Sequence, residues 1–119
     1  MVTKEEVNNL IKRLLSANKE YSKDNIIFID YCKTKMQDRG IEESLVIETL
    51  NNSSNLYYAE KQEVFLKEKK ETRHKLIYKI SSKYSLIIIV VYEERILKVV
   101  NVIKTSKSAE KLWRKKISE

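Results

Sequence analysis

One histidine and a set of cations toward the C-terminus are the side chains best suited to chemistry in this 119-residue chain. His74 is the only histidine, so a mechanism that needs two imidazoles is excluded, although one imidazole can act as a general acid or base. A plainer interpretation makes His74 a surface residue near a sheet edge. Arg95 lies in the segment EER, which is also typical of a charged hairpin turn. The candidates for a catalytic role are His74, Arg95 and Lys104.

A second group of side chains is suited to binding a polyanion. It consists of Lys104, Lys107, Lys111, Arg114 and Lys115. In a helix, positions 107, 111, 114 and 115 fall on one side, where their charges would act together on phosphates. Trp113 lies among them and is suited either to stacking on a base or to anchoring this segment in the core beside Leu112.

The basic character of the chain belongs to its second half. Residues 55–119 contain 16 Lys or Arg and 8 Asp or Glu, whereas residues 1–54 contain 8 and 9. An even cover of lysines is often only a solvated surface, but clustering near the C-terminus favours a phosphate-rich partner such as RNA. The net charge of +7 is therefore interpreted as a candidate nucleic-acid surface.

Composition limits the other classes of function. With one Gly, one Cys and one His, the chain cannot form a glycine-rich phosphate loop, a multi-cysteine zinc site or a disulfide of its own. We therefore expect no cofactor and no metal. The longest apolar run, residues 86–92, is too short to span a bilayer, and no signal peptide is evident. These features predict a single cytoplasmic domain over residues 1–119 with no membrane association.

The first half of the chain has helical patterning. Thr3 followed by Glu6 forms a capping box before an amphipathic helix over residues 4–18. Asp30 is a candidate cap for a second helix, which should end at Gly40 because glycine readily adopts the left-handed conformation found there. A third helix begins with acidic residues at 42–43. The short apolar run at 26–29 is compatible with either an edge strand or the approach to a helix.

From residue 56 onward the pattern becomes extended. Five segments (LYYA, EVFLKEK, HKLIYKIS, YSLIIIVVY and RILKVVNVIK) predict an antiparallel meander, and a short basic helix over residues 108–117 should follow it. The predicted fold class is thus α+β, in which N-terminal helices pack on one face of a four- or five-stranded antiparallel sheet.

Residues 28–50 carry a family resemblance. Lys35-Met36, Arg39-Gly40-Ile41 and Leu50 match an uncharacterised family with a His, Arg-Met and Arg-Gly-Ile pattern, in which Tyr31 takes the place of the histidine. The order of helices, meander and basic ending is similar to RelE/BrnT-type ribonuclease toxins. The resemblance covers residues 26–117 as a toxin-like α+β core, to which the helix at 4–18 looks like an addition.

The resemblance implies an RNA-binding or RNA-cleaving protein of a toxin–antitoxin pair. In such a metal-independent endoribonuclease, the RNA 2′-hydroxyl attacks the neighbouring phosphate while cations stabilise the added charge. The implied partners are RNA and an acidic antitoxin protein. An alternative is a non-catalytic nucleic-acid-binding or oligomeric assembly module of the same fold, in which the N-terminal helix mediates a homodimer.

Overall fold

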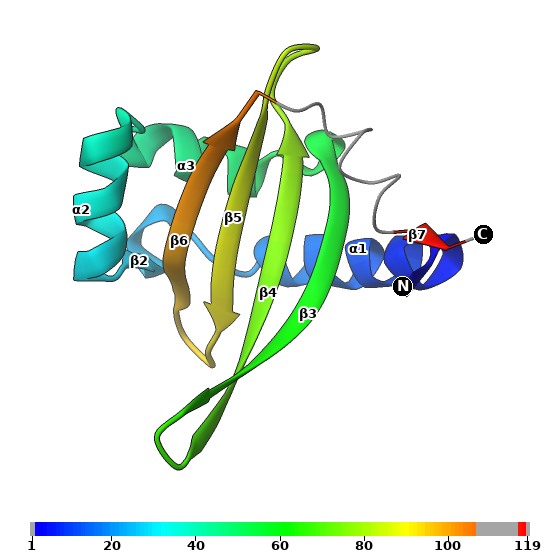
Figure 1. The fold of residues 1–119 in the computed structure, drawn as a ribbon, viewed down its shortest axis with the longest axis horizontal. Helices are drawn as coiled ribbons and strands as arrows, with labels where there is room; N and C mark the ends of the chain where they lie inside the picture. The colour runs from blue at the N-terminus through cyan, green and yellow to red at the C-terminus, as the bar shows by residue number, and fades with distance from the viewer. Residues whose placement is uncertain (1, 107–116, 119) are drawn as a thin grey trace.

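The computed structural model describes residues 2–106 and 117–118, and it confirms the α+β class. Three helices, α1 (Lys4–Asn18), α2 (Asp30–Arg39) and α3 (Glu43–Asn51), precede the main run of strands. Figure 1 shows α1 and α3 behind the sheet and α2 beside its β6 edge. None of the helices in the described ranges is long and apolar enough to cross a membrane.

The helix boundaries follow from local capping. The Thr3 hydroxyl oxygen accepts a hydrogen bond from the Glu6 amide at 3.1 Å, and α1 has the bounds that the sequence predicts. Gly40 ends α2 with φ of 68°, and the amides of Gly40 and Ile41 donate back to carbonyls in the last turn. The prediction for Asp30 was wrong, because the cap residue is Ile29 and Asp30 already lies inside the helix.

The large sheet has five strands in the order β2-β6-β5-β4-β3. The strands β3 (Leu56–Leu66), β4 (Lys69–Lys79), β5 (Ser85–Tyr92) and β6 (Leu97–Thr105) form the predicted antiparallel meander. The segment LYYA and the first four residues of EVFLKEK form one continuous strand, β3, and the rest of EVFLKEK makes the turn and the first residue of β4. The sheet is mixed, because β2 (Ile26–Phe28) is an edge strand that pairs in parallel with β6.

The core lies between the helices and the inner face of the sheet. Alternate residues of a strand point to the same face, and the buried part of the inner face is mainly apolar. Its buried members include Leu76, Tyr78, Leu86, Ile88, Val90, Val99 and Val102. Leu14 of α1 packs in this cluster, together with Cys32 and Met36 of α2 and Leu50 of α3. The helix at 4–18 therefore contributes directly to the core.

Most of the predicted final helix lies outside the described residues, which exclude 107–116. Its last residue was predicted wrongly, since Ile117–Ser118 form strand β7 and pair in parallel with β1 (Val2–Thr3) at the start of α1. Pairing between the two ends of the chain is a long-range contact that local periodicity does not reveal.

Candidate nucleic-acid interface

The three predicted catalytic residues do not share one cleft. Arg95 lies in the turn before β6, and Lys104 lies near the far end of that nine-residue strand. At about 3.3 Å per residue the two positions are roughly 25–30 Å apart. The exposed Lys104 places its ammonium 4.3 Å from the centre of the Tyr84 ring. The other predicted binding residues, Lys107, Lys111, Arg114 and Lys115, lie outside the described ranges.

The segment Glu93-Glu94-Arg95 is the predicted charged turn. The Glu93 amide donates to the Ile96 carbonyl oxygen at 3.0 Å, which closes the chain reversal between β5 and β6. Arg95 is exposed at this end of the sheet. Its position favours the structural interpretation over a place in a catalytic centre with Lys104.

His74 lies inside the sheet, so its predicted position near a sheet edge was wrong. On β4 it stands opposite Lys61 of β3 and Val90 of β5. Its half-buried ring meets the Tyr92 ring edge-on, with 5.2 Å between ring centres and 73° between ring planes. The pairing places the side chain on the inner face, on the same side as Leu76, since positions two apart share a face.

Burial and nearby cations keep the His74 imidazole neutral at pH 7. Burial lowers the pKa of His74, and the positive charges of Arg13 and Lys61 lower this pKa further. The Nδ1 atom is enclosed and has no hydrogen-bond partner among the residues described. A neutral imidazole near two exposed cations is an arrangement suited to an anionic ligand.

Arg13 and Lys61 reach this site from different elements. Both are exposed, and both line a hollow of about 530 Å³ between α1 and β3. Together with His74 they form what we call the cationic site. The hollow also has acidic walls, Glu6 and Glu60. Glu60 is already engaged, because it accepts a hydrogen bond from the Tyr58 hydroxyl at 3.1 Å and lies 3.9 Å from the Lys75 ammonium.

A buried polar network holds the wall behind His74. The Tyr92 hydroxyl donates to the Asn18 side-chain oxygen at 2.7 Å, and the Asn18 amide donates to the Tyr78 hydroxyl at 3.4 Å. Burial raises the pKa of both tyrosines, so their hydroxyls stay protonated. The network ties α1 to β4 and β5 and thereby fixes the Tyr92 ring against the imidazole.

Of the three members of the cationic site, the sequence patterns had indicated His74 alone. Arg13 belongs to a helix that the resemblance treats as an addition, and Lys61 was one lysine among many. The signal that could have found Lys61 was the β3–β4 register, which places it opposite the only histidine. Within the described ranges no three His, Cys, Asp or Glu side chains are grouped so that they could hold a metal.

The lowered pKa of His74 gives the stability of the protein a pH dependence. Between the folded pKa and the unfolded value of about 6.5, the unfolded chain binds a proton that the folded chain does not. We expect the His74 contribution to be fully present above pH 6.5 and to be lost as the pH falls through the folded pKa. Urea denaturation between pH 4.5 and 8 should show a weaker loss in His74→Gln than in wild type. Parallel curves for the two proteins would contradict the expectation.

No protein-family model matches this chain, and neither curated proteins nor solved structures give a match. The structure supports the resemblance only at the level of an α+β fold, in which N-terminal helices precede a five-stranded mixed sheet.

Proposed function

We propose that this protein binds RNA through the cationic site formed by Arg13, Lys61 and His74. The observation that carries the proposal is a neutral imidazole near two exposed cations, Arg13 and Lys61, which come from other elements and line one hollow. Two cations at the rim of a hollow can contact successive phosphates, and the imidazole can bond a ribose hydroxyl. Lys104, Lys107, Lys111, Arg114 and Lys115 stay in the proposal as cations that extend the contact along the RNA.

Cleavage is a second, narrower candidate function. In a RelE/BrnT-like reaction His74 would accept the proton of the attacking 2′-hydroxyl, while Arg13 and Lys61 stabilise charge on the phosphate oxygens. The lowered pKa of His74 favours this role, since a base must be neutral before it accepts a proton. Arg95 and Lys104 do not join this centre. A toxin of this kind would be neutralised by an acidic protein that covers the same cations.

Binding is tested with a fluorescent single-stranded RNA and a double variant, Arg13→Ala with Lys61→Ala. We expect about a tenfold or greater loss of affinity at low salt, and a decrease of about 1.4 in the slope of log affinity against log salt, about 0.7 for each lost phosphate contact. The matched control is Lys23→Ala with Lys33→Ala, which removes two exposed cations from other elements. Equal affinities and slopes for the two double variants would refute the cationic site.

The single histidine provides a direct second measurement. Because the molecule has one imidazole, a proton–nitrogen NMR spectrum reports His74 alone. A bound phosphate should raise the pKa of His74, since a negative charge favours the imidazolium form. Cleavage separates from binding in His74→Gln, because the glutamine amide can still hydrogen-bond a ribose hydroxyl but cannot accept its proton. This variant should keep most of the RNA affinity and lose any cleavage. Unchanged cleavage in that variant would eliminate the catalytic role.

A further inference from the structure

The hairpin formed by β3 and β4 continues beyond the rest of the sheet. The β4–β5 ladder begins at His74, so the strand residues before it have no partner on β5. Residues 62–73 therefore form a two-stranded arm, visible in Figure 1 as the loop that projects below β5 and β6. Lys67 at its tip has φ of 57°, a left-handed conformation that suits a tight reversal.

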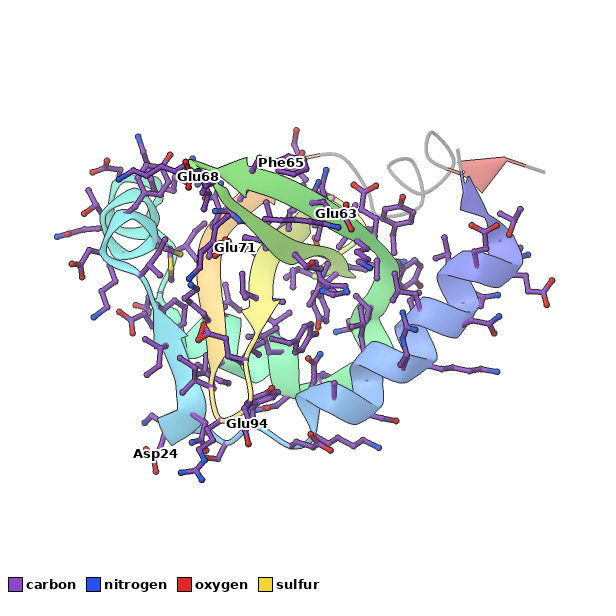
Figure 2. The ribbon with its side chains drawn as sticks, turned by 90° about the horizontal axis from the view of Figure 1, so that it is seen from below. Asp24, Glu63, Phe65, Glu68, Glu71 and Glu94 are labelled. Carbon is purple, nitrogen blue, oxygen red and sulfur yellow. The ribbon has the colours of Figure 1, made fainter. Side chains whose placement is uncertain are left out.

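The arm exposes apolar side chains beside an open strand edge. Phe65 is 75 % exposed and Leu66 is 45 % exposed, and Figure 2 shows Phe65 on the arm near Glu63. In the described part of the chain β3 has one ladder partner, β4, so its other edge offers unpaired amide and carbonyl groups. An exposed edge strand with an aromatic side chain is a template for another strand.

The sequence of β3 is complementary to itself about Gln62. When a second copy of β3 is laid antiparallel along this edge with the two Gln62 residues opposite each other, Lys61 of each copy faces Glu63 of the other. In the same register Ala59 faces Phe65, and Tyr58 faces Leu66. Moving the centre to Glu63 would place two glutamates together, and moving it to Val64 would place Lys61 opposite Lys67. Opposite charges across a strand pair stabilise it, whereas like charges destabilise it.

We propose that β3 pairs with β3 of a second copy of this chain in this register. The resulting dimer is symmetric, because each copy presents the same edge to the other. Its sheet is continuous across the two molecules. The β3 edge favours a second copy of itself as the partner, since the register that pairs Lys61 with Glu63 also pairs the apolar side chains of the two strands.

The hollow between α1 and β3 receives the second copy's aromatic ring. Phe65 shares the inner face with Ala59, which lines the hollow, and Val7 and Leu10 of α1 form its apolar wall. The hollow of about 530 Å³ is open and has room for a phenyl ring. Each copy thus inserts its Phe65 ring into the hollow of the other copy, and both Phe65 side chains become buried.

Formation of this dimer regulates the cationic site, a consequence that rests on the proposed function. Lys61 faces Glu63 of the second copy, and the hollow that it shares with Arg13 is filled. RNA and the second copy therefore compete for the same surface. The dimer itself rests only on the β3 edge.

A single cysteine at the centre of the register tests the pairing. In Gln62→Cys the two new thiols lie opposite each other, and oxidised glutathione should link most of the protein into a covalent dimer at micromolar concentration. The native Cys32 does not interfere, because it is fully buried and burial raises the pKa of its thiol to about 11. The matched control is Lys69→Cys, because Lys69 is exposed on the other strand of the arm. This variant should stay monomeric on a non-reducing gel. Equal linking of both variants, or none of either, would overturn the register.

Sedimentation tests the contacts without new cysteines. Phe65→Ser should weaken dimerisation by about a hundredfold, since the loss counts twice in a symmetric dimer at about tenfold for each ring. Tyr31→Ser, a loss of another exposed ring, is the control and should not change it. Glu63→Lys should also dissociate the dimer, and Lys61→Glu with Glu63→Lys should restore it. A wild type that stays monomeric at hundreds of micromolar, or a swap that fails to restore pairing, would refute the proposal.

Competition is measured separately, so that the two proposals can fail independently. Phe65→Ser should bind RNA at least as tightly as wild type, and the covalent Gln62→Cys dimer should bind about tenfold more weakly than the same protein after reduction. Loss of RNA binding in every form would refute the RNA proposal and leave the dimer intact. Equal RNA binding by the oxidised and reduced forms would refute the regulation.

Discussion

Replacing Asn18 by alanine is expected to lower the free energy of unfolding by about 2–4 kcal/mol. Asn18 is 4 % exposed and bonds two tyrosine hydroxyls, those of Tyr92 and Tyr78. Without its side chain both hydroxyls lose this bond in the protein interior, and each unsatisfied group costs about 1–3 kcal/mol. Urea denaturation followed by circular dichroism measures the change.

The controls for this prediction lie on the same helix and in the same network. Asn8→Ala makes the identical substitution at an exposed position of α1 and should change stability by less than about 0.5 kcal/mol. Adding Tyr78→Phe and Tyr92→Phe to Asn18→Ala should recover part of the loss, because the unpaired hydroxyls are gone. If Asn18→Ala and Asn8→Ala unfold at the same urea concentration, the network does not stabilise the fold.

The same substitution is expected to change the cationic site. Asn18 holds Tyr92, and the Tyr92 ring lies against the imidazole of His74. Loss of this support should move the single histidine signal in the NMR spectrum before any RNA is added. In Asn8→Ala the signal should stay where it is in wild type.

Replacing Leu76 by alanine is expected to lower the free energy of unfolding by about 2–5 kcal/mol. Leu76 is 0 % exposed on the inner face of β4, where Ala59 and Ile88 stand opposite it on the neighbouring strands. The methyl group of Ala59 cannot fill the space that the leucine leaves, so a cavity remains. The midpoint of urea denaturation should fall while its slope stays constant.

Ile27→Ala is the matched control for the core substitution. It removes a similar side chain from edge strand β2, at a position that is 44 % exposed. We expect it to cost less than about 1 kcal/mol, since little buried area is lost. A cost in Leu76→Ala no greater than that in Ile27→Ala would mean that the inner face of β4 is not the centre of the core.

The parts of the fold that could be predicted were those with local causes. The helix at 4–18 follows from the cap at Thr3 and an apolar stripe, and the end of α2 follows from a single glycine in a left-handed conformation. The meander follows from apolar runs joined by short polar turns. The parallel pairing of β2 with β6 was not predictable in this way, because about 70 residues separate the two strands.

The residues of the candidate site also fall into those that the sequence could predict and those that it could not. His74 could be selected from the sequence because it is the only imidazole, and the surplus of cations in the second half could be counted. Arg13 and Lys61 could not be selected, since α1 brings one and the β3–β4 register brings the other. The separation of Arg95 from Lys104 could also have been predicted, because the segment that joins them, RILKVVNVIK, has strand patterning of its own.

By itself, then, the sequence determined the α+β class, the bounds of the first helix, the basic character of the second half and the candidacy of one histidine. Each of these depends on residue type or on neighbours within a turn. Only the tertiary structure decided that His74 is half-buried against Tyr92, that the cations near it are Arg13 and Lys61, and that β3 has a single ladder partner among the described residues, beside a hollow. The physical reason is that burial, pKa and surface shape arise from contacts between residues far apart in the chain.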